Sequence, residues 1–409
     1  MPHWCIQQLP RIILGINRGL ARKGTRYRLM AWALAIAMFL ATWPLLPAEA
    51  QSPPFRVEAA GAVLMDARSG EVLFAQDETR RWVPASLVKL MTLRLAFQDL
   101  RSGKIKPETP VTVSEKAWRT GGSRMFLNVG DQVAVSDILR GVAVASGNDA
   151  TVALAELLGG AEEAFVARMN EEAARLGLSD TRFVDSSGLA VEGQFMSALD
   201  AARLARAYIS DFPEALQIHS MVEFTYGGIR QFNRNGLLRT YEGADGLKTG
   251  HVEESGYNLI ATAQRQGTRL IAVVMGTASE KSREQEAAKL LNFGFANFET
   301  ALVAGQGEPV ASLRVYKGTV NRVNLVPTEE VAATVPRGQK DVATRVEAPP
   351  SAVAPLEAGQ QLGEMVVLKG DRELKRVPLV AAEAVPRGGF FKVLLDSVLI
   401  FLARVFRRG

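Results

Sequence analysis

Two side chains three residues apart, Ser86 and Lys89, could act together as a nucleophile and its base. Residues 84–89 read PASLVK, and a proline just ahead of a helix favours the geometry of the first turn. The spacing of three places the hydroxyl and the amine on one face of that turn. Lysine can take the serine proton only if burial or a second cation lowers its pKa. The pair alone is a weak signal, because an N-cap serine beside a solvated lysine has the same spacing.

A second polar pattern, SGN, occupies residues 146–148, between an apolar run and the start of another predicted helix. In a serine enzyme, Ser146 would relay a proton and Asn148 would hydrogen-bond the amide of the substrate. Ordinary capping of a helix by Ser or Asn is the structural alternative. This pattern alone favours capping.

A third pattern, KTG at residues 248–250, comes just before a predicted strand. Lys248 would be the second cation that Lys89 needs, and with Thr249 it would hold a substrate carboxylate. Gly250 would leave room for substrate backbone beside the strand edge. The alternative is an ordinary turn, since Thr-Gly is common in loops.

Ser-x-x-Lys, Ser-x-Asn and Lys-Thr-Gly in this order form the motif set of the penicillin-recognising serine enzymes. The chain resembles the low-molecular-mass penicillin-binding D-alanyl-D-alanine carboxypeptidases along nearly its whole length. The resemblance is carried by four segments: PASLVK at 84–89, SGNDA at 146–150, NRN at 233–235 and DGLKTGH at 245–251.

The resemblance implies a mechanism and its residues. Ser86 would attack the penultimate D-alanine carbonyl of a peptidoglycan stem pentapeptide, with the oxyanion held by the backbone N–H groups of Ser86 and His251. Arg234 would help hold the substrate carboxylate. Water would resolve the acyl-enzyme, no metal or organic cofactor would be needed, and β-lactam antibiotics would acylate Ser86.

The elements around these motifs predict an α+β fold. Residues 62–66 and 71–75 read as a hairpin, helical patterns dominate from 84 to about 209, and strand patterns return at 257–263 and 269–275 before a last helix at about 284–298. This order indicates an antiparallel sheet flanked by helices, the penicillin-binding and β-lactamase-like transpeptidase fold. We expect a catalytic domain over 51–304 and a small all-β domain over 305–386.

The N-terminus reads as an export signal over residues 1–50, because a basic stretch precedes an apolar run that ends in Ala48-Glu49-Ala50. A retained membrane anchor is the alternative. Six of the 48 basic residues and one of the 43 acidic residues lie in this segment, so the rest of the chain is neutral. The basic pI therefore gives no reason to expect nucleic-acid binding. The predicted location is the periplasmic face of the bacterial inner membrane.

The C-terminal segment 387–409 predicts an amphipathic helix on the membrane surface. Its apolar face includes Phe391, Leu395 and Phe401, and its other side carries Lys392 and Asp396. Charges in the middle make a spanning helix expensive. The sequence PRGG at 386–389 predicts a hinge that detaches the helix, whereas docking on the protein's own core is the alternative.

Three other functions use overlapping signals. A serine β-lactamase shares the three motifs, but no Glu-x-x-Leu-Asn pattern lies between Asn148 and Lys248, and the chain has additional C-terminal parts. A DD-endopeptidase would use the same residues, so only substrates separate the two. An inactive wall-binding protein is the non-enzymatic alternative. Neither His219 nor His251 lies in a triad motif, and no Cys or His pattern indicates a metal site.

Overall fold

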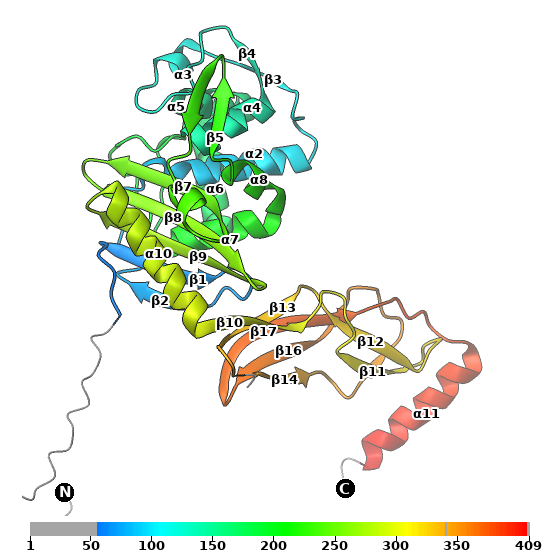
Figure 1. Ribbon diagram of the computed structural model, residues 1–409. Helices are drawn as coiled ribbons and strands as arrows, with labels where there is room; N and C mark the ends of the chain where they lie inside the picture. The colour runs from blue at the N-terminus through cyan, green and yellow to red at the C-terminus, as the bar shows by residue number, and fades with distance from the viewer. Residues whose placement is uncertain (1–54, 340–341, 407–409) are drawn as a thin grey trace, which may run out of the picture. The chain divides into compact units, whose positions relative to one another are not determined.

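The predicted N-terminal hairpin opens the first domain of the computed structural model, which describes residues 55–339 and 342–406 (Figure 1). β1 (Gly61–Asp66) and β2 (Val72–Gln76) pair antiparallel. Asp66 closes the turn between them, because its Oδ1 accepts hydrogen bonds from the backbone N–H groups of Arg68 and Ser69. The predicted export signal, 1–50, lies outside the described residues.

The hairpin belongs to a five-stranded antiparallel sheet with the order β2-β1-β9-β8-β7. The strands that complete it are β7 (Ala244–Val252), β8 (Gly256–Arg265) and β9 (Thr268–Thr277). The last two contain the predicted strands and extend them at both ends. The Lys-Thr-Gly motif lies inside β7, at one edge of the sheet, rather than in a loop before the next strand.

The two faces of this sheet bury different sets of apolar side chains. Val63 of β1 belongs to the large core that also contains Leu204 of α7 (Ala198–Asp211). Leu64, the next residue, points to the other face, where a Cβ added to Gly294 of α10 (Glu280–Asn297) would lie 2.9 Å from it. Helices therefore cover both faces, as the strand alternation requires. Figure 1 shows α10 crossing the sheet.

The helical block between β2 and β7 confirms the predicted α+β class. It also contains two short antiparallel hairpins that were not predicted, since three or four residues are too few for a clear strand pattern. Its helices are η1 (Ala85–Val88), α2 (Lys89–Arg101), α3 (Glu115–Arg119), α4 (Val135–Arg140), η2 (Gly141–Ala145), α5 (Asn148–Gly159), α6 (Glu162–Arg175), α7, η3 (Pro213–Ala215), α8 (Leu216–His219) and α9 (Leu237–Thr240). The hairpins are β3 (Pro110–Thr112) with β4 (Gln132–Ala134) and β5 (Glu223–Tyr226) with β6 (Ile229–Phe232).

The C-terminal domain is all-β, as predicted, but it begins at Phe298 rather than at residue 305. The reason is that β10 (Phe298–Ala304) pairs with β13 (Val331–Pro336). A six-stranded sheet has the order β14-β16-β17-β12-β11-β15. Its strands are β11 (Ala311–Tyr316), β12 (Arg322–Pro327), β14 (Val342–Glu347), β15 (Ser351–Val353), β16 (Gln361–Lys369) and β17 (Arg372–Ala381).

The last element is the predicted C-terminal helix, α11 (Phe390–Phe406). Within the described residues, no helix combines the length and the apolar character that crossing a membrane demands. The predicted hinge at 386–389 is not a free linker. Its backbone is hydrogen-bonded to the β11–β12 turn, with Thr319 N–H donating to Pro386 O and Gly388 N–H donating to Lys317 O.

Candidate active site

Ser86 lies in a short 3-10 turn, η1, that leads directly into α2. Ala85, just before it, has a φ of 50°, so the backbone turns sharply there. The segment at Gly188 packs on this turn so tightly that a Cβ on Gly188 would lie 1.9 Å from Ala85 O. Lys89 begins α2, and its Nζ lies 2.9 Å from Ser86 Oγ. The predicted pair of nucleophile and base is therefore in hydrogen-bond contact.

The side chain of Lys89 is fully buried, and its amine has three hydrogen-bond partners. Besides Ser86 Oγ, Nζ donates to Asn148 Oδ1 over 2.6 Å and to the carbonyl oxygen of Ser187 over 2.5 Å. The last two can only accept. A neutral amine keeps two N–H bonds for these acceptors, and its lone pair then faces the hydroxyl of Ser86. The three contacts thus suit an amine that takes the serine proton.

The pKa of Lys89 is lowered from 10.5 to about 7; burial is the largest cause, and the charge of Arg234 acts in the same direction. The carboxylates of Asp185 and Asp149 act in the opposite direction. Of the two causes that the sequence allows, burial and a second cation at Lys248, burial is the larger one here. A lysine with such a pKa can serve as a general base near neutral pH.

Asn148 positions the base. Its Nδ2 donates to Gly121 O over 2.7 Å, and its backbone N–H donates to Ser123 O over 2.7 Å. Because the amino group is used by Gly121, the amide oxygen must face Lys89. The amide oxygen thus contacts Lys89 and the amino group contacts Gly121, whereas the sequence predicts that Asn148 binds the substrate amide.

Ser146 and Lys248 form the second polar pair. Lys248 Nζ donates to Ser146 Oγ over 2.9 Å and to Thr249 O over 3.0 Å. Ser146 follows the π-helical turn η2 and has a left-handed backbone with φ 58°. Burial lowers the pKa of Lys248 well below the ordinary value, and the charge of Lys89 adds to this effect.

Gly250 lets the β7 edge approach the nucleophile. A Cβ at this position would lie 2.9 Å from Pro84 O and 3.2 Å from Ser86 N. The sequence predicts that this glycine leaves room for substrate, whereas in the structure the turn that carries Ser86 lies where its Cβ would be. Thr249, next to it, is only 6% exposed.

Buried polar groups hold β7 from behind. His219 is fully buried, with Nδ1 bonded to Leu247 O over 2.9 Å and Nε2 to the Tyr208 hydroxyl over 3.1 Å. Asn235 Nδ2 donates to Gly246 O over 2.9 Å. Burial lowers the pKa of His219 to about 4. The imidazole is therefore a neutral structural group, which agrees with the absence of a triad motif around it.

Arg234 and His251 are the exposed members of the predicted set. Arg234 bears a charge that reaches both buried lysines, and its carbonyl oxygen accepts a hydrogen bond of 2.9 Å from Arg283. The imidazole of His251 stacks on Tyr257, with 4.0 Å between the ring centroids. Eight of the nine predicted site residues thus lie on η1, α2, β7 or at the start of α5 and just before it, and the ninth, Arg234, lies in the loop between β6 and α9.

Four residues that support this site received no role from the sequence: Asp185, Asp149, Arg283 and Ser187. Asp185 accepts hydrogen bonds from the N–H groups of Ser187 and Gly188, and so holds the carbonyl that contacts Lys89. Asp149 accepts hydrogen bonds from the backbone N–H groups of residues 125–127. Arg283 is 2% exposed and keeps an unpartnered Nε. The DSSG sequence at 185–188 is an Asx-type turn signal that could have revealed Asp185. A contact through the Ser187 backbone has no sequence signature.

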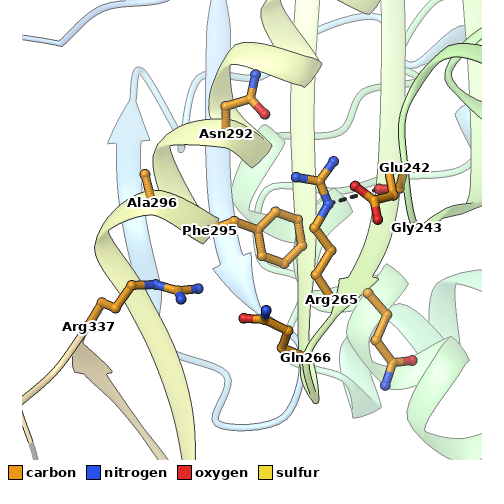
Figure 2. A pocket seen from close by; sticks show the side chains of 9 residues that line it. Glu242, Gly243, Arg265, Gln266, Asn292, Phe295, Ala296 and Arg337 are labelled. Atoms are coloured by element: carbon orange, nitrogen blue, oxygen red, sulfur yellow. Dashed lines mark hydrogen bonds between the residues drawn. The ribbon is translucent and has the colours of Figure 1, made fainter.

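A surface pocket of about 880 Å³ lies elsewhere, lined by residues that include Arg265, Phe295 and Arg337 (Figure 2). No predicted catalytic or substrate-binding residue lines it. Arg265 extends across Phe295, and its Nε donates to Glu242 O. The described part of the chain contains no cluster of His, Cys, Asp and Glu that could hold a metal ion.

Comparison with known proteins gives two family matches. The model for D-alanyl-D-alanine carboxypeptidase, peptidase S11, matches residues 47–279, and that for the penicillin-binding protein 5 C-terminal domain matches residues 298–387. The second match starts at the first residue of β10, in agreement with the boundary that the strand pairing gives.

Among relatives, D-alanyl-D-alanine carboxypeptidase DacA of Escherichia coli K12 is 40% identical over 352 residues, 84% of this chain and 87% of the relative. DacD of Salmonella typhimurium LT2 is 41% identical over 386 residues, 90% and 97% of the two chains. The structure resembles penicillin binding protein 5 from Haemophilus influenzae, with a TM-score of 0.75 at 40% identity, over 82% of this chain and all of the other.

Proposed function

The chain belongs to the D-alanyl-D-alanine carboxypeptidase family, peptidase S11, and we propose that Ser86 and Lys89 carry its reaction. The observation that supports this most directly is the 2.9 Å contact between Lys89 Nζ and Ser86 Oγ. Lys89 takes the hydroxyl proton, and Oγ attacks the carbonyl carbon of the penultimate D-alanine. The terminal D-alanine leaves, and water then hydrolyses the ester on Ser86.

Ser146 serves as the proton donor to the departing amine in this proposal. Its Oγ already accepts a hydrogen bond from Lys248, so its own hydroxyl proton is free for the leaving nitrogen. Lys248 can replace that proton.

Substrate recognition falls to β7 and Arg234. The free carboxylate of the terminal D-alanine suits the hydroxyl of Thr249 and the exposed guanidinium of Arg234. The oxyanion suits the backbone N–H groups of Ser86 and His251, which the close approach of Gly250 to Ser86 brings near each other. In this scheme Asn148 orients Lys89 through its amide oxygen.

The exported, membrane-bound location rests on the two ends of the chain. The signal-like composition of residues 1–50 supports export. Exposed apolar side chains on α11 support binding to a lipid surface, with Phe390 76%, Phe391 84% and Phe401 66% exposed.

Release of D-alanine from a diacyl tripeptide and from a stem pentapeptide tests the proposal. Wild type should release it, Ser86→Ala should release none above background, and Ser312→Ala on the exposed face of β11 should behave as wild type. Release by Ser86→Ala at the wild-type rate would refute the assignment.

Radiolabelled penicillin should form a long-lived adduct with wild type only. Fast turnover would instead indicate a β-lactamase, and a cross-linked muropeptide assayed in parallel detects endopeptidase activity.

A further inference from the structure

The segment that joins the β domain to α11 is tied down along its length. Val385 pairs with Leu356, and Arg387 pairs with Gly318 of the β11–β12 turn. The packing is close, since a Cβ on Gly388 would lie 2.9 Å from Gly318 O. The segment therefore continues the β domain up to the first residue of the helix and leaves no free hinge before it.

A carboxylate then fixes the helix itself. Asp396, two turns into α11, is 2% exposed, and its Oδ2 accepts a hydrogen bond of 2.5 Å from the backbone N–H of Lys317. Lys392, one turn earlier, contacts both carboxylate oxygens at 3.0 Å and 2.9 Å. Lys317 has a left-handed backbone with φ 60° within this turn. We call the three residues the Asp396 clasp.

The carboxylate of Asp396 stays ionised near neutral pH. Burial alone would raise the pKa of Asp396, but the hydrogen bonds from Lys392 and from the Lys317 N–H lower it below its ordinary value, and the charge of Arg314 acts in the same direction. Lys392 and Arg314 are the charged groups that act on it from the helix and from β11. A buried, paired carboxylate of this kind holds a fixed geometry, because its release would leave groups without partners.

The clasp places the polar side of α11 against the β domain and leaves its apolar side exposed, which is the reverse of a helix docked on a protein core. Its polar side, with Lys392, Asp396 and Ser397, is buried or half-buried, whereas Leu394 and Leu395 on the apolar side are 53% and 60% exposed. An amphipathic helix in water would bury its apolar side instead. A lipid surface is the partner that matches this orientation, since it accepts the apolar side along the whole length of the helix.

We infer that α11 is rigidly attached to the β domain (a mount) rather than joined to it by a flexible linker (a tether). In this arrangement Asp396 is the residue that fixes the angle between the helix, and so the membrane surface that it binds, and the β domain. The inference rests on the proposed membrane binding, but it concerns the connection between helix and domain. In a tethered enzyme the two would rotate independently. In a mounted one they move together.

Spin labels test this connection in the full chain, with Cys5 changed to serine. One label is placed at Leu402→Cys on α11 and one at Thr328→Cys, an exposed residue after β12. The distance between them is measured by pulsed electron resonance, in solution and on vesicles of phosphatidylethanolamine and phosphatidylglycerol. We expect one narrow distribution under both conditions. Asp396→Ala should lose the narrow peak, and Asp396→Asn, which keeps an acceptor for Lys317 but not the ion pair, should broaden it less.

Asp371→Ala, at an exposed carboxylate between β16 and β17, is the matched control and should leave the peak unchanged. All variants should release D-alanine from a soluble peptide at the wild-type rate, because Asp396 does not touch the active site. A broad wild-type distribution, or a narrow one that survives Asp396→Ala, would overturn the mount. Failure of the wild type to float with vesicles would instead overturn the proposed membrane binding. The distances between the labels in solution would still test the rigid attachment of α11.

Discussion

Gly250 of β7 lies against the backbone of Ser86, and a Cβ at position 250 would come within 3.2 Å of Ser86 N. Such a distance is shorter than ordinary contacts between a Cβ and a backbone atom. The edge strand and the nucleophile turn therefore have a fixed separation, which exists only because residue 250 has no side chain.

Gly250→Ala should consequently push η1 away from β7. Because a shift of about 1 Å in a reacting group can reduce the rate roughly 100-fold, we expect a large loss in kcat with a folded protein. Gly389→Ala is the control, since nothing lies within 4 Å of a Cβ there. D-alanine release and circular dichroism of both variants measure the effect. Full activity in Gly250→Ala would contradict the proposed geometry.

The rate of acylation should rise with pH through a single ionisation near 7. Lys89 acts as a base only when neutral, and its pKa is lowered to about 7, so protonation removes activity below that pH. The pH profile of kcat/KM for a tripeptide reports this group in the free enzyme. A limb near the ordinary lysine value of 10.5 would rule out a buried neutral amine.

Asp185→Asn should move that limb to lower pH. The negative charge of Asp185 raises the pKa of Lys89, so its loss lowers the pKa further, while the amide oxygen can still accept from Ser187 and Gly188. Glu192→Gln, at an exposed position in the next segment, should leave the profile unchanged. A shift to higher pH would mean that Asp185 acts on another group.

The stability of the fold should fall between pH 7 and pH 5 because of His219. In the folded protein its pKa is about 4, whereas the unfolded chain binds a proton near 6.5, so the unfolded state gains protons first as the pH falls. The contribution over this range is roughly 2 kcal/mol. Urea unfolding at the two pH values measures it. His219→Gln, which cannot titrate, should show a smaller pH dependence, and an unchanged one would contradict this origin.

Much of the catalytic set could be predicted because its chemistry depends on side chains at fixed spacing. Ser86 and Lys89 share one helical turn, so their contact follows from local geometry. The hairpin at 61–76 and the strands β8 and β9 carry strong alternation, and the structure contains all of them.

Other parts depend on contacts between distant segments, which a single sequence does not encode locally. The Ser187 carbonyl bonds Lys89 from 98 residues away through its backbone, and any residue type supplies a carbonyl. Burial, which dominates the pKa of Lys89, is set by packing from several helices. The short β10 strand was assigned to the wrong domain because only its pairing with β13 identifies its domain.

The place of β7 at the end of the sheet order has a further consequence for solubility. Among the described strands, only β8 pairs with β7, so the other edge of β7 has no strand beside it, and unprotected edges of this kind invite pairing with a second molecule. Natural sheets protect such edges with inward-pointing charges and covering loops. Lys248, buried within β7, and the η1 turn at Gly250 provide both. We therefore expect the residues proposed to bind substrate also to disfavour edge-to-edge association between copies of the enzyme.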